Sequence, residues 1–365
     1  MKLLSRAGSS VLRVGVYNIG DKQVYDLIID KPLDDDFFKQ LYKQLVSSYS
    51  YFPLQIRDTN PILRLVPVNT TRKLGIRILL LVLTTLTIAL TGYGLSEAFF
   101  SLINSAGLRV IGLNTLIYTV VFLGILGFHE YGHIMVSRRN GVVIEGPFFL
   151  PAPPIQLGFI GTLGAVITMK TLPPTRRELA ELGIMGPLAG YLAGLVIGVI
   201  AVFLSPVISI DVVKKLMEEG RVSGIDFMPL TLALLILIRG IPEGYTLIMH
   251  PLLFVSFVVF IVTFLNLMPI GQLDGGHVVR AFLSAKTYER IGYVVIVLII
   301  SLGLFIDGQI GTYYLFLGTV LLLLKLILGL RPHPGPANQY SRDINYRYIV
   351  TYLLLVILTM PIPSM

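Results

Sequence analysis

Long apolar stretches, separated by short polar and often basic segments, dominate this sequence. A helix needs about 20 mainly apolar residues to cross the hydrocarbon core of a membrane. Seven stretches reach or approach that length, at residues 74–94, 112–137, 181–204, 252–269, 290–306, 311–330 and 347–361. The pattern predicts a mainly α-helical polytopic membrane protein with about seven transmembrane helices.

Two further apolar stretches do not fit a straight spanning helix. Residues 230–238 are too few to span, so we expect a re-entrant or interfacial segment there. Residues 155–169 are rich in glycine and β-branched residues and follow a proline-rich run over 147–154. Both features argue against a straight helix, and irregular backbone at membrane depth is stable only where protein or water covers it. We therefore expect a re-entrant, β-hairpin-like segment.

The first 72 residues have a different character from the rest. Residues 11–16 and 23–29 are strand-like, and apolar side chains recur at helical spacing over 34–47, behind an acidic start that suits a helix N-terminus. These patterns predict a small α/β domain over 1–72, a membrane domain over 73–285, and additional C-terminal transmembrane helices over 286–365. Regulation, substrate handling and simple packing are all open roles for the first domain.

Composition supports a chain that lies mostly in lipid. It is 54% hydrophobic and only 14% charged, with a mean hydropathy of +0.79. The formal charge of +8 comes from basic residues beside the apolar stretches, which favours contact with anionic lipid head groups and not with nucleic acid. No signal-peptide pattern opens the chain. The absence of cysteine excludes disulfides, thiolate ligands and a cysteine nucleophile.

The basic clusters also predict an orientation. With seven spans, they all fall on one side of the membrane, which the positive-inside rule makes cytoplasmic. We therefore expect a multi-pass integral membrane protein whose N-terminal domain and active-site opening lie on the cytoplasmic side.

A metal-binding motif lies near the end of the second apolar stretch, where His129, Glu130 and His133 form H-E-x-x-H. Positions i and i+4 share one face of a helix, so both imidazoles can bind one ion. Glu130 lies beside that ion and can act as general base toward a bound water. The alternative is that H-E-x-x-H occurs here by chance, at a helix end in contact with solvent.

A third ligand is expected at Asp274. It lies deep in an apolar run, after the helix-breaking Pro269 and before two glycines. An aspartate so placed is costly unless a cation pairs with it. The second and fourth spans end on the same side, so Asp274 and His133 can meet at one depth. A simple helix-capping role is the alternative reading.

Together these residues carry a family resemblance. The H-E-x-x-H at His129, with Asn266-x-x-Pro269 and Leu273-Asp274-Gly275, resembles the site-2 protease family of intramembrane metalloproteases. The intervening 148–161 and 186–190 segments are similar to its EGY-like subgroup. The resemblance covers about residues 110–285.

The resemblance implies one Zn²⁺ per chain, with His129, His133 and Asp274 as ligands and Glu130 as catalytic base. It also implies that Asn266 holds the substrate backbone or the developing oxyanion. An interhelical hydrogen bond is the alternative for Asn266. One departure is Gly190, where the family often has asparagine; close helix packing is a sufficient reason for a glycine there.

The expected activity is hydrolysis of peptide bonds in or near the transmembrane segment of a single-span membrane protein. An exposed strand edge in 155–169 could hold the unwound substrate by β-addition, or this segment could be a packing loop. Two roles are open for His277: it could hydrogen-bond a metal ligand, or it could be a solvated loop residue. His250 and His333 receive no role.

Two other classes remain as alternatives. A transporter or channel could hold a metal at His129, His133 and Asp274, but we find no second copy of either motif, and Glu130 would have no task. A non-cleaving pseudoprotease is the other, and the complete set of ligands and base argues against it. Iron(II) or cobalt(II) would also suit two histidines and a carboxylate.

Overall fold

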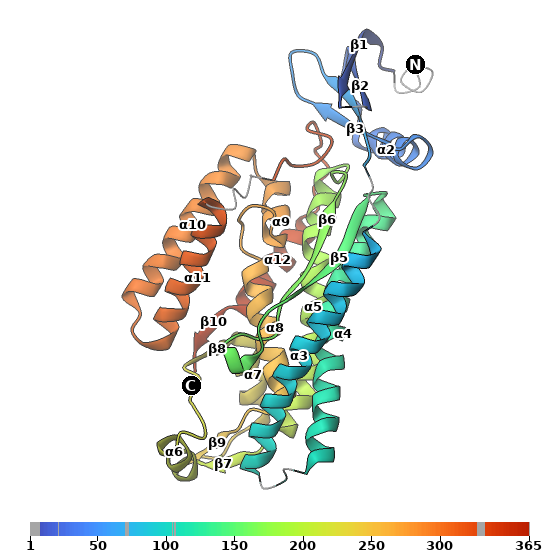
Figure 1. Cartoon of the computed structure of the whole chain (residues 1–365). Helices are drawn as coiled ribbons and strands as arrows, with labels where there is room; N and C mark the ends of the chain where they lie inside the picture. The colour runs from blue at the N-terminus through green and yellow to red at the C-terminus, as the bar shows by residue number, and fades with distance from the viewer. Residues whose placement is uncertain are drawn as a thin grey trace.

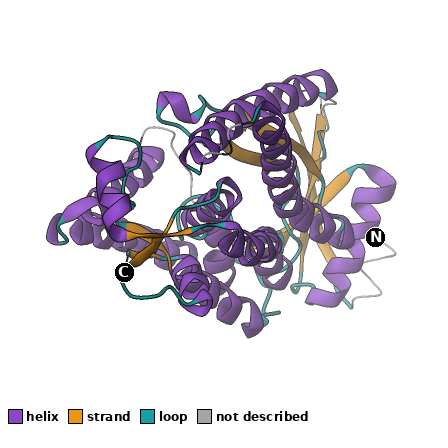
Figure 2. Ribbon diagram, turned by 90° about the horizontal axis from the view of Figure 1, so that it is seen from below, coloured by secondary structure: helices purple, strands orange, loops and turns teal. Residues whose placement is uncertain are grey.

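The computed structural model describes residues 8–20, 22–69, 73–103, 105, 107–326 and 333–364. A long helical bundle carries a small α/β unit at one end (Figure 1). Seen from below, most of the ribbon is helical and a smaller part is strand (Figure 2). The expected mainly helical fold is therefore confirmed.

The N-terminal unit contains a four-stranded antiparallel sheet in the order β1-β2-β4-β3. Its strands are β1 (Val11–Ile19), β2 (Lys22–Ile29), β3 (Tyr51–Ile56) and β4 (Ile62–Pro67). Helix α2 (Asp35–Tyr49) packs Phe38 and Tyr42 into the sheet's core. The Asp34 side chain caps this helix by accepting a hydrogen bond from the Phe37 amide at 2.9 Å. The predicted strands and helix are confirmed.

A segment from the far end of the chain completes the edge of this sheet. The Gln55 amide donates to the Ala337 carbonyl at 2.9 Å, and the Gln339 amide donates to the Gln55 carbonyl at 3.0 Å. The Gln55 side chain is 0% exposed, and its Nε2 donates to Asn338 Oδ1 at 2.9 Å and to the Leu33 carbonyl at 3.2 Å. Residues 337–339 therefore act as a fifth, parallel neighbour of β3.

Among the described residues, four helices are long and apolar enough to cross a membrane: α3 (Leu74–Leu102), α4 (Leu108–Asn140), α5 (Arg176–Leu204) and α10 (Ala285–Phe305). The other predicted spans coincide with shorter apolar helices, namely α8 (Pro251–Asn266), the part Ile310–Leu323 of α11 (Gly308–Leu326), and α12 (Tyr346–Thr359). Residues 327–330 of the predicted span 311–330 lie outside the described residues. The count of seven spans stays a prediction.

Helix α8 ends earlier than the apolar run does. The predicted span 252–269 is wrong at its end, because the helix stops at Asn266. Pro269 has no amide hydrogen and disfavours helical backbone in the residue before it, so the chain turns here. After this turn α9 (Asp274–Phe282) begins. The break places Asp274 at the start of a new helix.

The remaining short elements lie between and beyond the long helices. Helix α7 (Leu230–Arg239) buries its first turn, where Thr231 Oγ1 donates to the Leu358 carbonyl at 2.8 Å. The others are α6 (Ile210–Glu218), the pair β7 (Val207–Ser209) and β9 (Tyr245–Leu247), and the pair β8 (Phe227–Pro229) and β10 (Pro361–Pro363).

An antiparallel hairpin occupies the glycine-rich segment that the sequence singled out. Strand β5 (Ile144–Pro151) pairs with β6 (Thr162–Met169), with a short 3₁₀ turn at Ile155–Leu157 between them. The hairpin runs alongside α3 and α4 (Figure 1). A hairpin-like structure is thus present, and its position in a membrane stays a prediction.

The buried Gln55 amide generates a stability prediction. Replacing Gln55 with Leu leaves the Leu33 amide and carbonyl and Asn338 Oδ1 without their buried partner. An unsatisfied buried polar group costs about 1–3 kcal/mol, so backbone amides of Leu33 and residues 337–339 should exchange hydrogen roughly 10-fold faster.

Hydrogen–deuterium exchange of the detergent-solubilised protein measures this. Gln40→Leu, at an exposed position of α2, is the matched control and should leave these rates unchanged. Equal exchange in Gln55→Leu and Gln40→Leu would contradict the prediction.

Candidate metal centre

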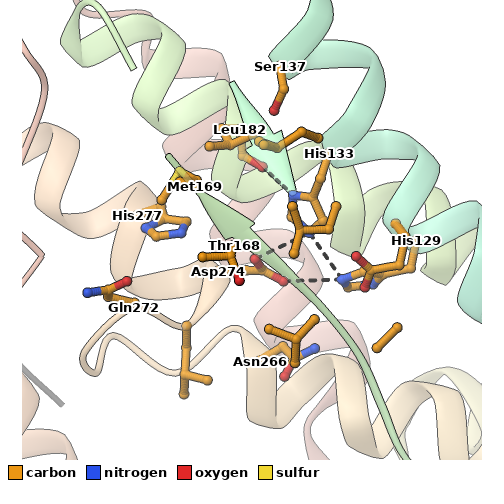
Figure 3. Close-up of a pocket in the computed structure, with 16 residues that line it drawn as sticks. His129, His133, Ser137, Thr168, Met169, Leu182, Asn266, Gln272, Asp274 and His277 are labelled. Atoms are coloured by element: carbon orange, nitrogen blue, oxygen red, sulfur yellow. Dashed lines mark hydrogen bonds and ion pairs between the residues drawn. The ribbon is translucent and has the colours of Figure 1, made fainter. Parts of the chain in front are cut away.

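Three of the predicted site residues converge on one point. His129 and His133 come from α4, and Asp274 is the first residue of α9. Their potential ligand atoms all lie within 4.8 Å of one another. Figure 3 shows the two imidazoles and the carboxylate facing each other. Residues about 140 positions apart in sequence therefore form one cluster, as the two motifs predicted.

The distances within the cluster fit a metal ion. His129 Nε2 lies 3.2 Å from His133 Nε2, Asp274 Oδ2 lies 3.3 Å from His129 Nε2, and Asp274 Oδ1 lies 3.3 Å from His133 Nε2. Zinc bonds of about 2.0–2.2 Å at tetrahedral angles place neighbouring donor atoms roughly 3.3–3.6 Å apart. The two nitrogens, and each nitrogen with the carboxylate oxygen that it faces, are therefore spaced like neighbouring donor atoms around such an ion.

A backbone contact orients His133 for metal binding. Its Nδ1 donates a hydrogen bond to the carbonyl of Leu182 on α5, at 2.9 Å. With the proton on Nδ1, the lone pair of Nε2 is free and points into the cluster. Metal-binding histidines usually hold their second nitrogen in this way. Sequence inspection missed Leu182, because a backbone carbonyl carries no residue-type signal.

Helix α5 comes close enough to touch both histidines because two of its residues lack a side chain. A Cβ atom on Gly186 would lie 2.0 Å from His133 Nε2, which no real contact allows. A Cβ on Gly190 would lie 3.1 Å from His129 Nδ1, a tight contact that small shifts could relieve. The expected packing reason for Gly190 is thus present, and Gly186 matters more.

The cluster opens into a cavity of about 340 Å³. Glu130, only 4% exposed, lines this cavity, and so does Asn266 at the end of α8. Residues 165–169 of β6 also line it. All five predicted site residues therefore line one cavity, and the catalytic roles of Glu130 and Asn266 stay predictions.

His277 and Ser137 are two buried polar residues that also line the cavity. His277 is 6% exposed, so the interpretation as a solvated loop histidine is wrong. Ser137, which the sequence reading overlooked, is 0% exposed. Its spacing indicates the position, because Ser137 follows His133 by the same four residues that separate His133 from His129 and so lies on the same helix face.

Comparison with known proteins places these features in a family. The model of peptidase family M50 matches residues 117–306, which include both motifs. Probable zinc metalloprotease EGY2 of Arabidopsis thaliana is 31% identical over 183 residues, covering 50% of this chain and 31% of that protein.

Two other zinc metalloproteases are also similar to this chain. EGY2 of Oryza sativa subsp. indica is 28% identical over 253 residues, covering 67% of this chain and 42% of that protein. Zinc metalloprotease MJ0392 of Methanocaldococcus jannaschii is 27% identical over 184 residues, covering 48% of this chain and 39% of that protein. The chain thus spans less than half of the length of these relatives. No solved structure matches it significantly.

The family match covers more than half of the 365 residues and contains the whole His-His-Asp cluster. The expected family is confirmed: the chain belongs to peptidase family M50, the site-2 proteases, and is similar to its EGY members.

Proposed function

We propose that this chain is an intramembrane zinc endopeptidase that hydrolyses peptide bonds in or near the transmembrane segment of single-span, membrane-anchored proteins. The observation that carries the proposal is the triangle of two imidazoles and one carboxylate, with a buried glutamate in the same cavity of an apolar helical bundle. Ionisable groups are costly in such surroundings and usually mark a functional site.

Zinc is the ion we propose for His129, His133 and Asp274. The donor spacing suits tetrahedral zinc, and the relatives EGY2 and MJ0392 are named zinc metalloproteases. A zinc ion held by these residues would lower the pKa of water and polarise the scissile carbonyl.

The remaining chemistry belongs to side chains of this chain. Glu130 accepts a proton from the attacking water, whose oxygen bonds to the scissile carbonyl carbon. When the carbon–nitrogen bond breaks, Glu130 delivers that proton to the leaving amine. Asn266 donates an amide hydrogen bond to the substrate carbonyl as negative charge develops on its oxygen. The cavity position of both residues supports these roles.

The same arrangement supports a route for the substrate. A transmembrane helix must unwind before its carbonyls can react, and an unwound segment needs partners for its main chain. Strand β6 borders the cavity and, in the described part of the chain, pairs only with β5. We infer that it holds the substrate by β-addition, in a seven-span protein whose site opens toward the cytoplasm.

Metal content tests the ligand set directly. We expect about one zinc per chain in the detergent-purified protein, measured by elemental mass spectrometry. Asp274→Ala and His133→Ala should each lose most of it, because each variant keeps only two ligands. Asp211→Ala, at an exposed position of α6, is the control and should keep its zinc. Native protein that stays free of zinc after supplementation would refute the site.

The role of Glu130 separates a protease from a metal transporter. Glu130→Gln should keep its zinc and lose about 10²- to 10⁴-fold in cleavage rate, because only the general base is removed. The assay uses a single-span model protein whose transmembrane segment contains a Gly-Pro break. Glu218→Gln, on exposed α6, should cleave normally. Full activity in Glu130→Gln would exclude the proposed mechanism.

The close approach of α5 predicts unequal effects of two alanine substitutions. Alanine is the better helix former by about 1 kcal/mol, so neither change should harm α5 itself. Gly186→Ala should weaken zinc binding roughly 10- to 100-fold, since overpacking displaces His133.

Gly190→Ala, with a looser contact to His129, should weaken zinc binding less than about 5-fold. Competition with a chromophoric chelator measures both affinities, and circular dichroism checks the fold. Equal affinities for the two variants would contradict this account of α5.

A further inference from the structure

Two polar atoms in the cavity have no hydrogen-bond partner among the described residues. They are Ser137 Oγ and His277 Nδ1, and each exposes almost no surface. Buried polar atoms are nearly always satisfied by protein, water or a ligand, since leaving one unpaired costs about 1–3 kcal/mol. Both residues line the cavity next to the cluster (Figure 3). Their missing partners are therefore to be sought inside that cavity.

The two atoms come from the two helices that carry the metal ligands. Ser137 lies one turn beyond His133 on the same face of α4, which is about 6 Å along the helix axis. His277 lies one turn beyond Asp274 on α9. In Figure 3, Ser137 and Asn266 lie on opposite sides of the cluster. Ser137 is thus a polar position separate from the proposed oxyanion partner.

Strand β6 supplies the wall along which a peptide can lie. Five consecutive residues, 165–169, line the cavity. Successive side chains of a strand point to opposite faces, so an unbroken run of lining residues means that the strand presents its edge. An extended peptide rises about 3.4 Å per residue, so the offset between Ser137 and His133 corresponds to roughly two residues.

We propose a subsite in which Ser137 Oγ hydrogen-bonds the main chain of the extended substrate about two residues from the scissile bond, and His277 Nδ1 supplies a second main-chain partner in the same cavity. A hydroxyl donates or accepts, and a neutral imidazole nitrogen does either according to its tautomer. Such partners match peptide N–H and C=O groups whatever the side chain. The subsite therefore recognises an unwound backbone and does not select for particular side chains. It rests on the proposed function, because it presupposes a peptide at the metal.

Binding of hydroxamates to the zinc-loaded full-length protein tests the subsite without requiring turnover. Acetohydroxamate reaches only the metal. Two longer probes carry the same hydroxamate with a three-residue apolar peptide tail extending in opposite directions from the metal-binding group. Ser137→Ala should bind one tailed probe about 3- to 10-fold more weakly than the native chain does, the effect of one neutral hydrogen bond. The other tailed probe and acetohydroxamate should bind unchanged.

Thr84→Val is the matched control. Thr84 Oγ1 is also buried and has no partner in the described part of the chain, but Thr84 belongs to α3 and does not line the cavity. This variant should bind all three probes as the native chain does.

Each other outcome has a distinct meaning. Unchanged binding of both tailed probes to Ser137→Ala overturns the subsite. Equal weakening of all three probes also overturns it, because Ser137 would then act on the metal cluster itself. Failure of the native zinc-loaded protein to bind acetohydroxamate refutes the proposed function, and the subsite with it.

Discussion

The structure depends on bringing two imidazoles and a carboxylate within 3.3 Å of one another inside an apolar bundle. Taking such groups out of water costs several kcal/mol per charge in real proteins, and a bound cation is the compensation that suits two nitrogens and an anionic oxygen. The cluster also requires α4, α5 and α9 to meet at one level. The rest of the site depends on the contact of these three helices.

Helix α5 is the element that makes the meeting possible. It contributes no predicted ligand, but its backbone binds His133 and comes close to His129. The Leu182 carbonyl orients His133, and the bare backbone at Gly186 leaves the space that His133 occupies. A Cβ atom on residue 186 would overlap the ring of His133. In this sense the packing of one helix determines the chemistry of two others.

The sequence predicted what local patterns encode. The four-residue spacing of His129 and His133, and the helix break before Asp274, were visible as patterns and led to the correct cluster. The N-terminal strands were visible through their β-branched composition. The pairing of residues 337–339 with β3 was not, because it depends on contacts between distant segments. Ser137 carries a sequence signal too, because it shares the four-residue spacing of the two histidines on α4.

The pairing of β3 with residues 337–339 has a consequence for biosynthesis. Gln55 and its partner Asn338 are 283 residues apart, and every described helix that is long and apolar enough to cross a membrane lies between them. At about 5–20 residues per second, a ribosome needs roughly 15–60 s to travel from one to the other. Throughout that interval the edge of the sheet has a vacant position. The first part of the chain to be made is thus among the last to be finished, and its completion coincides with the arrival of the C-terminal segment.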